Sequence, residues 1–410
     1  MGKRATQDAA VWVIRRLREA GFEALLAGGC VRDMLLHLRA ADYDVATNAH
    51  PEQVRGLFRR VLMVGAKFGV AMVLHGKRVV EVATFRSEAD YSDGRRPDHV
   101  VFSCAREDAL RRDFTINGMF LDPIAGRVID YVGGQEDLAA RRIRAIGKAD
   151  LRFGEDYLRM LRGVRFAARF DFALEEATAA AIARHAAKIS QISGERIREE
   201  LEKMFEFPRG RAAMELMHTL GLAQQVFGPS VAAGPAWRAA MERLERLDRL
   251  RDPTLSLAAI LGGQPPATIH ALIRRWGGSN ELRTMLAWLA EHLDEWSHAP
   301  DMPLPALKRL MAHDGWPRLR RLWRTEEQRQ TGRTAASRRL ASRLSTIDPA
   351  QIAPPPLLTG EDLKALGLSE GPRLGKILRA IFERQLAEEI ATHEQAVEAA
   401  KLLIAGPARG

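Results

Sequence analysis

Two carboxylates, Asp42 and Asp44, stand two residues apart, and residues 43–47 read as a strand. Because side chains alternate between the two faces of a strand, both carboxylates leave the same face, a few ångströms apart. Two carboxylates this close repel each other unless a cation lies between them. Mg²⁺ prefers all-oxygen ligands of this kind. The spacing therefore predicts that Asp42 and Asp44 hold a magnesium ion.

The stretch before this acidic pair, residues 25–33, begins with apolar residues and continues through Gly28, Gly29 and Arg32. The apolar residues predict a buried strand, the glycines a tight turn, and the residues after them a helix. Glycines let the backbone approach a phosphate group, and the free N–H groups of the following helix point towards it. Arg32 adds a bidentate donor for phosphate oxygens. A phosphate cradle beside a magnesium pair is the equipment of a nucleotidyl transferase.

These two motifs together resemble the start of the DNA polymerase β nucleotidyltransferase superfamily, in the branch of the bacterial CCA-adding enzymes and poly(A) polymerases. Residues 28–33 fit the pattern G-G-x-V-R-D of that branch, and Asp42 with Asp44 fits its aspartate pair. The resemblance implies an α+β fold, with a nucleotidyltransferase head built from a small mixed β-sheet and helices. All-helical neck, body and tail domains follow the head. It also implies Mg²⁺ as cofactor, and nucleotide binding by Gly29 and Arg32.

Composition limits the class of protein. The chain has 410 residues, 28% charged and 46% apolar, which suits several globular domains. Its net charge of +10 favours a polyanionic partner such as nucleic acid. Two cysteines argue against a disulfide framework and fit a reducing cytoplasm. No apolar stretch has the length of a membrane span and the N-terminus lacks a signal segment, so we expect a cytoplasmic protein without membrane contact.

A third carboxylate, Glu81, lies within the apolar strand-like run of residues 79–84. One interpretation is a charge on an edge strand that points to solvent. The other is a carboxylate that faces Asp42 and Asp44 from a neighbouring strand, where it helps to hold the metal or takes the proton from an attacking hydroxyl. The family resemblance favours this second, catalytic interpretation.

Residues 86–97 form a long polar stretch with charges of both signs. It reads either as an exposed hairpin loop or as a lid, since long loops beside metal sites often close over them. It is similar to the flexible loop of CCA-adding enzymes, which the resemblance links to the switch from C to A addition. The candidate loop residues are Asp90, Tyr91, Asp93, Arg95 and Arg96.

Residues 105–122 show an apolar periodicity that predicts a packed helix with a buried asparagine, Asn117. Within it, Arg112 and Asp113 resemble the family motif R-R-D-F-T-I-N, in which the second arginine reaches the nucleotide. The alternative interpretation is a helix cap with a salt bridge between these two residues.

Residues 155–166 predict one helix. At about 100° per residue, Glu155, Arg159 and Arg162 fall within a narrow arc, and Asp156 lies about 60° to one side. Such a face is also what an ordinary salt-bridged surface helix shows.

Asp156 and Arg159 have a chemistry that suits base selection. Cytosine and adenine both present an amine donor next to a ring-nitrogen acceptor, and a carboxylate beside an arginine offers the complementary groups. Guanine and uracil present the reverse arrangement. The pair therefore predicts selection of C and A without a nucleic-acid template. It matches the family motif E-D-x-x-R, and the resemblance places Arg162 and Arg165 at nucleotide contacts too.

Beyond residue 205 the pattern is helical. Arginines recur over residues 318–343 with Trp316 and Trp323, which suits RNA contact and stacking, although both tryptophans fit a core position equally well. The predicted domains are the catalytic head at 1–140, the base-recognition neck at 141–205, the RNA-binding body at 206–350 and the tRNA-binding tail at 351–410.

The resemblance implies a class II tRNA nucleotidyltransferase that adds C, C and A to the 3′ end of tRNA from CTP and ATP, with release of pyrophosphate. It implies no partner protein. A poly(A) polymerase of the same fold is an alternative, against which Ala66 stands where that branch carries a basic residue. An enzyme that adds only A is another. An inactive RNA-binding protein is a remote third, disfavoured by Asp42, Asp44 and Arg159.

Overall fold

The computed structural model describes residues 4–63, 69–89 and 99–405. The loop candidates Asp90, Tyr91, Asp93, Arg95 and Arg96, and the discriminating Ala66, lie outside the described residues. The chain divides into two compact units. The first unit comprises Met1–Trp237, Asp248–Pro253 and Arg275–Gly278, and the second comprises Arg238–Leu247, Thr254–Arg274 and Ser279–Gly410.

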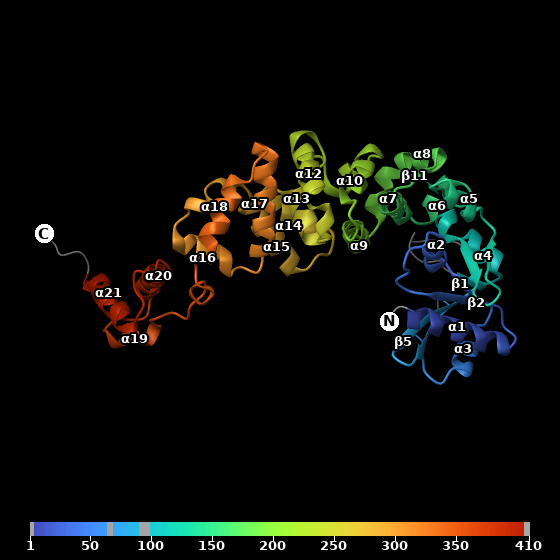
Figure 1. Ribbon diagram of the computed structural model, residues 1–410, viewed down its shortest axis with the longest axis horizontal. Coiled ribbons are helices and arrows are strands. Elements are labelled where there is room, and N and C mark those ends of the chain that lie inside the picture. Colours follow the sequence, from blue (N-terminus) through green and yellow to red (C-terminus); the bar gives the residue numbers. More distant parts are fainter. Residues whose placement is uncertain (1–3, 64–68, 90–98, 406–410) are drawn as a thin grey trace. The chain divides into compact units, whose positions relative to one another are not determined.

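A seven-stranded sheet forms the centre of the N-terminal part, drawn in blue and cyan in Figure 1. Its strands lie in the order β3-β4-β5-β2-β1-β8-β9. β2 and β5 run parallel and the other neighbours are antiparallel, so the sheet is mixed. This sheet and the helices around it confirm the predicted α+β fold. The strands are β1 (Ala24–Ala27), β2 (Asp44–Thr47), β3 (Val61–Leu62), β4 (Val70–His75), β5 (Arg78–Thr84), β8 (Met119–Asp122) and β9 (Arg127–Asp130).

Apolar side chains of alternate strand residues explain how this sheet is buried. Leu25, Phe85 and Phe120 belong to one core cluster, with the two phenylalanine rings edge to face at 5.8 Å. The helices of this part are α1 (Arg4–Glu19), α2 (Gly29–Leu35), α3 (Pro51–Leu57), α4 (Ala105–Leu110) and α5 (Gly134–Ala139). β6 (Arg86–Ala89) and β7 (His99–Phe102) pair with each other in a separate small sheet.

The single helix predicted over residues 105–122 is wrong. The chain forms α4, a short 3₁₀ turn η2 (Thr115–Asn117) and strand β8 instead. The side chain of Asp113 accepts hydrogen bonds from the N–H of Phe114 at 2.8 Å and from Asn117 Nδ2 at 3.0 Å. Such local bonds from an aspartate compete with helical backbone bonds and stop a helix. Asn117 is buried, as expected.

The helix predicted over residues 155–166 is two helices, α6 (Ala149–Glu155) and α7 (Leu158–Phe170). The break falls at Asp156, whose carboxylate accepts the N–H of Leu158 at 3.0 Å and so starts α7. Downstream in the first unit lie β10 (Arg142–Ile143) paired with β11 (Ala173–Leu174), α8 (Glu176–His185), α9 (Gly194–Phe205), α10 (Gly210–Thr219) and α11 (Leu222–Phe227).

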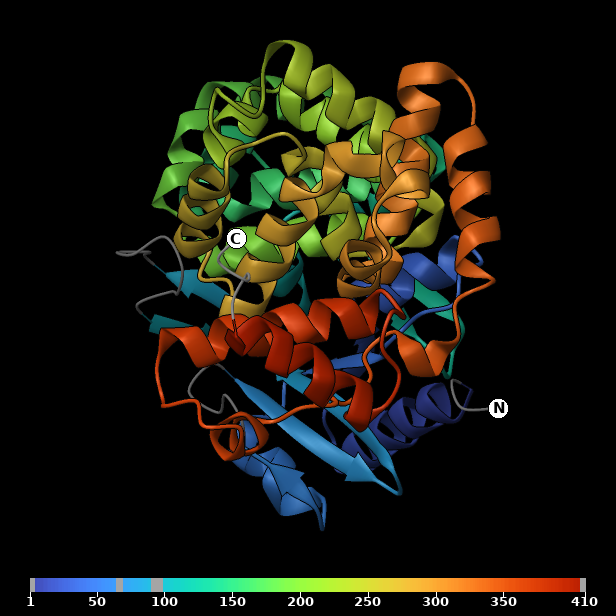
Figure 2. The same cartoon turned by 90° about the vertical axis from the view of Figure 1, so that its left-hand side faces the viewer.

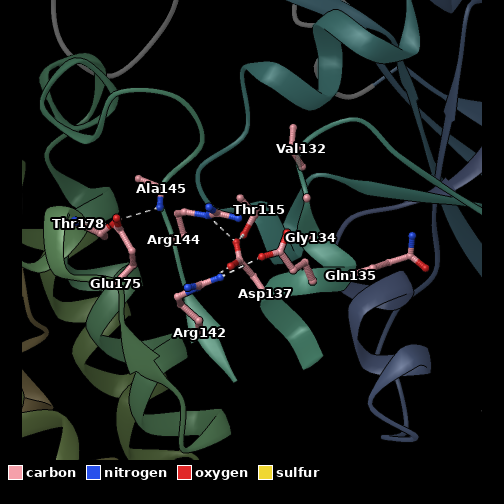
Figure 3. A network of polar contacts seen from close by, with 12 residues as sticks. Thr115, Val132, Gly134, Gln135, Asp137, Arg142, Arg144, Ala145, Glu175 and Thr178 are labelled. Carbon is pink, nitrogen blue, oxygen red and sulfur yellow. Dashed lines mark hydrogen bonds and ion pairs between the residues drawn. The ribbon is translucent and has the colours of Figure 1, made fainter. Parts of the chain in front are cut away.

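A buried carboxylate, Asp137 of α5, ties the sheet domain to the helices that follow it (Figure 3). It accepts hydrogen bonds from Thr115 Oγ1, Arg142 Nε and Arg144 Nε, each at 2.7 Å. Thr178 of α8 extends this connection, because its hydroxyl accepts the N–H of Ala145 at 3.1 Å. Elements on both sides of residue 140 are therefore held in one polar network.

The second unit is entirely helical. The buried Arg243 donates to Glu326 at 2.7 Å, and Trp323 is only 2% exposed and donates its indole N–H to the carbonyl of His292. Trp316 and Trp323 are thus core residues rather than stacking surfaces. Its helices are α12 (Gly234–Leu247), which it shares with the first unit, α13 (Pro253–Leu261), α14 (Pro266–Arg275), α15 (Asn280–Glu291), α16 (Leu304–Ala312), α17 (Trp316–Thr331) and α18 (Ala335–Leu344).

The last three helices, red in Figure 2, are α19 (Gly360–Ala365), α20 (Pro372–Leu386) and α21 (His393–Ala405). They share a cluster of buried aliphatic side chains that includes Leu363, Ile377 and Ile381. Across the described ranges, no helix combines the length and apolar character needed to cross a bilayer.

Asp137 provides a test of the polar network. We expect Asp137→Asn to cost about 2–3 kcal/mol of folding free energy, because two arginines lose their buried charge partner. The corresponding fall in Tm is about 5–10 °C. Thermal unfolding followed by circular dichroism measures it. The matched control is Glu136→Gln, whose side chain is 75% exposed and lies 3.4 Å from Arg142, so that it should change Tm little. Equal shifts in the two variants would contradict this role of Asp137.

Candidate active site

A cleft of about 550 Å³ lies within the first unit, between the edge of the sheet and helices α7 and α9. Four of its described lining residues are acidic, namely Asp44, Glu81, Asp113 and Asp156. Nine are arginines, namely Arg32, Arg86, Arg111, Arg112, Arg159, Arg162, Arg165, Arg169 and Arg196. This excess of positive charge fits a polyanionic ligand.

The acidic residues gather at the edge of β2 and β5. The parallel register pairs Val45 with Val82, which puts Asp44 beside Glu81 on the next strand. Burial raises the pKa of Asp44 to about 6, and the charges of Glu81 and Asp42 add to the rise. Asp42 is exposed just before the strand and is not part of the cleft lining. The predicted carboxylates are therefore close in charge, but only Asp44 and Glu81 line the cleft.

The acidic cluster suits a divalent cation by the chemistry of its donors. Asp44 is ionised at a cost in this place, because like charges surround it and Arg112 alone opposes them among its main influences. Within residues 4–63, 69–89 and 99–405, no three His, Cys, Asp or Glu side chains are arranged around one point as a ready-made metal cage. Mg²⁺ needs no such cage, since it is usually held by one or two carboxylates together with substrate phosphates and water.

Gly28, at the end of β1, is required by two features of its position. Its φ is +71°, a left-handed conformation that favours glycine, and a Cβ there would lie 2.7 Å from Arg112 Nη1. Any side chain would therefore strain the backbone and displace Arg112. Gly29 follows it and lines the cleft at the start of α2.

Arg32 is 4% exposed and is held on three sides. Its Nε and Nη2 donate to Asp33 Oδ1 at 2.8 and 2.6 Å, and Nη1 donates to Asn117 Oδ1 at 2.5 Å. Its guanidinium lies over the ring of Phe170, 4.6 Å from the centroid. Burial lowers the pKa of Arg32 from its ordinary value, although Asp33 opposes this effect.

Arg112 is held by the buried Asp108 of α4. Its Nη2 donates to Asp108 Oδ2 at 2.8 Å, and its Nη1 donates to the carbonyl of Asn117 at 3.2 Å. The other oxygen of Asp108 accepts from Arg111 at 2.7 Å. One carboxylate thus fixes two neighbouring guanidinium groups at the wall of the cleft.

Asp113 joins the sheet domain to α7. It accepts from Arg162 Nε at 2.8 Å and forms an ion pair with Arg162 Nη2 at 2.7 Å. Burial disfavours its ionised form, but the charge of Arg162 and the hydrogen bonds from Asn117 and from the N–H of Phe114 outweigh burial and lower its pKa. Arg165 is held in the same way by Glu200 of α9, at 2.6 Å.

Asp156 and Arg159 both line the cleft, but they are not partners of each other. Asp156 forms an ion pair with Arg196 of α9 at 2.7 Å. Arg159 is paired with Glu155 and also donates to the carbonyl of Arg152 at 2.9 Å. The break between α6 and α7 explains this difference, because Asp156 leaves the helical face on which Glu155 and Arg159 lie one turn apart.

Sequence reasoning missed the residues that hold the arginines. These are Asp33, Asp108, Glu200 and Arg196, together with Asp113 as the partner of Arg162. Asp33 and Asp113 lie within the family motifs and Asp108 lies three residues before one, so acidic residues beside motif arginines were an available signal. Arg196 and Glu200 lie on α9, far along the chain from the arginine and aspartate that they hold, and local spacing gave no signal for them.

Comparison with known proteins supports the same assignment. Residues 24–144 match the poly(A) polymerase head-domain family, and residues 171–234 match a family described as the probable RNA- and SrmB-binding site of polymerase A. The chain is 39% identical over 301 residues to the CCA-adding enzyme of Lactobacillus johnsonii, covering 72% of this chain and 73% of that one. It is 35% identical to the CCA-adding enzyme of Lactobacillus helveticus over 94% of each chain.

Solved structures extend the similarity to the fold. The Bacillus stearothermophilus CCA-adding enzyme in complex with CTP matches with a TM-score of 0.74 and 28% identity, over 94% of each chain. The Thermotoga maritima CCA-adding enzyme complexed with tRNA has the same fold, with a TM-score of 0.67 over 96% of this chain and 94% of that one. With 35% identity to a relative along nearly the full length of both chains, the protein belongs to the family of the CCA-adding enzymes.

Proposed function

We propose that the chain is a template-independent tRNA nucleotidyltransferase that adds C, C and A to the 3′ end of tRNA from CTP and ATP. One observation carries this proposal: a single cleft combines the carboxylates Asp44 and Glu81 with the arginine-lined helices that contain Asp156 and Arg159. The first group suits nucleotidyl transfer, and the second suits binding of a triphosphate and a base. The names of the relatives, and the CTP in the Bacillus structure, support this substrate class.

In this mechanism Asp42 and Asp44 would hold Mg²⁺, which neutralises the triphosphate and activates the attacking 3′-hydroxyl when bound. Glu81 stands beside Asp44, where it either supplements the ligands or accepts the hydroxyl proton. The cleft-lining Arg32, Arg112, Arg162 and Arg165 would bind the phosphates, since each arginine keeps N–H donors beyond those used by its carboxylate. Gly29 lets the chain pass close to the same phosphates.

Asp156 and Arg159 would read the base. Arg196 and the N–H of Leu158 hold Asp156 in place, while its oxygens keep lone pairs free to accept the amine of C or A. Glu155 holds Arg159, whose remaining donors suit the ring nitrogen. For the loop that contains Asp90, Tyr91, Asp93, Arg95 and Arg96 we propose a part in the change from C to A addition.

A poly(A) polymerase is the second candidate, because the matched head-domain family carries that name. Incubation of the purified protein with tRNA transcripts that end before CCA, with CTP and ATP singly and together, separates the possibilities. Addition of three nucleotides and no more to tRNA supports the proposal. A-only addition to a tRNA ending in CC, or long A tails on other RNAs, supports the alternatives.

The first functional prediction concerns the aspartate pair. Asp44→Ala and Asp42→Ala should each lower the rate of CTP and ATP incorporation at least about 1000-fold, since a catalytic metal contributes several kcal/mol. Binding of tRNA should stay nearly intact, because the arginines remain. Single-turnover incorporation and filter binding measure the two effects. The exposed Asp8→Ala is the control, and ordinary CTP incorporation by Asp44→Ala would sink the metal assignment.

Stability gives a test of the same site that needs no activity. Since the pKa of Asp44 is raised to about 6, its ionisation destabilises the folded protein as pH rises through about 4 to 6. Without divalent cations, Asp44→Asn should therefore raise Tm at pH 8 and have little effect at pH 4. Mg²⁺ should raise the Tm of the parent protein at pH 8 more than that of the variant. If Mg²⁺ stabilises both proteins equally, it binds elsewhere.

Base selection is tested at Asp156. Asp156→Ala should lose about one to two orders of magnitude of discrimination against GTP and UTP, the value of a good edge hydrogen-bond pair. Arg196→Ala should relax selection to a smaller degree, because the carboxylate stays but is no longer held. The control is Arg198→Ala, since Arg198 pairs with Glu202 and does not line the cleft.

The measurement is single-turnover incorporation of all four nucleotides onto tRNA that ends at the discriminator base or in CC. Unchanged exclusion of GTP and UTP by Asp156→Ala would mean that its charge is structural. A larger effect of Arg198→Ala than of Arg196→Ala would contradict the positioning role of Arg196.

A further inference from the structure

A second hollow, of about 440 Å³, lies on the second unit between α17 and α18. Arg320, Arg321 and Arg324 line it from α17, and Arg338 lines it from α18. We call these four residues and the space between them the arginine groove. All four side chains belong to exposed residues. The partly buried Trp296 also lines the groove and supplies an aromatic surface.

The four arginines have no carboxylate partner within salt-bridge distance among the residues described by the structure. Other arginines of the same two helices do have one: Arg329 pairs with Glu326 at 2.7 Å, and Arg339 pairs with Asp301 at 2.5 Å. The uncompensated charges are therefore concentrated in one place rather than spread over the helices. Gathering like charges in one hollow is unfavourable unless an anion enters it.

The acidic residues of α17 are turned away from the groove. Glu326 is 1% exposed and holds Arg243 and Arg329. Glu327 is 2% exposed and accepts the N–H groups of Ala336 and Ser337 at the start of α18. These buried bonds fix α18 against α17, so the walls of the groove are rigid before any ligand arrives.

We propose that the arginine groove binds the phosphate backbone of the RNA substrate, independently of its sequence. Guanidinium groups bind phosphate through paired N–H donors, and a half-exposed indole such as that of Trp296 stacks on a ribose or base without reading its edge. The described lining contains no Asn, Gln, Asp or Glu that would select a base. This inference rests on the proposed function, which makes an RNA the substrate.

The test compares two double variants of the full-length protein. Arg320→Glu with Arg324→Glu reverses two charges in the groove. Arg238→Glu with Arg274→Glu makes the same charge change at two exposed arginines of the second unit that do not line it. Thermal unfolding checks that both variants fold. The measurements are the Kd for tRNA lacking CCA across a range of salt concentrations, and single-turnover CTP incorporation at saturating tRNA.

We expect the groove variant to bind tRNA at least about tenfold more weakly and the control about two- to threefold more weakly. The salt dependence of log K should become shallower by nearly one unit for each phosphate group that the variant no longer binds. An unrelated RNA should lose affinity by the same factor. The rate at saturating tRNA and the KM for CTP should stay at the parent values, because the cleft is unchanged.

Equal losses in the two double variants would overturn the proposal, as would a rise in the KM for CTP. Stabilisation of the parent but not of the groove variant by inorganic triphosphate, with unchanged RNA binding, would assign the groove to a small polyphosphate instead. The binding assay contains no CTP or ATP. A parent protein that binds RNA through the groove but incorporates no nucleotide would therefore refute the proposed function and leave the groove standing.

Discussion

One electrostatic constraint governs the cleft: nine arginines line it, and like charges gathered in one place repel each other. Buried carboxylates make this arrangement stable. Asp33, Asp108, Asp113 and Glu200 are all buried, and each holds at least one cleft arginine. Removal of any of them would leave a guanidinium group inside the protein without its partner, which is far more costly than loss of a surface ion pair.

Most of these pairs join separate elements, and this gives the site its geometry. Asp113 follows α4 whereas Arg162 lies on α7, and Asp33 of α2 reaches Arg169 near the end of α7 at 3.2 Å. The phosphate-binding and base-reading sides of the cleft therefore share one rigid frame. A transferase that reads a base without a nucleic-acid template needs such a frame, because a small displacement between base and α-phosphate lowers the rate.

Local patterns could be predicted from the sequence, and long-range partners could not. The strand before Gly28, the position of Glu81 beside Asp44 and the α+β fold follow from periodicity, turn residues and motif order. The break at Asp156 was missed because its cause is one side chain that bonds to the backbone two residues on. The partner of Asp156 was missed because Arg196 lies 40 residues away, at a distance where helical spacing carries no information.

Two aspartates of the cleft show how environment separates structure from chemistry. Asp113 receives Arg162 and two further hydrogen bonds, and its pKa is lowered although it is buried. Asp44 receives mainly like charges, and its pKa is raised to about 6. A carboxylate whose needs are met inside the protein has little left to offer a ligand, whereas one kept among like charges gains from any cation that arrives. Opposite pKa shifts within one cleft therefore mark Asp113 as the fastening and Asp44 as the reactive end.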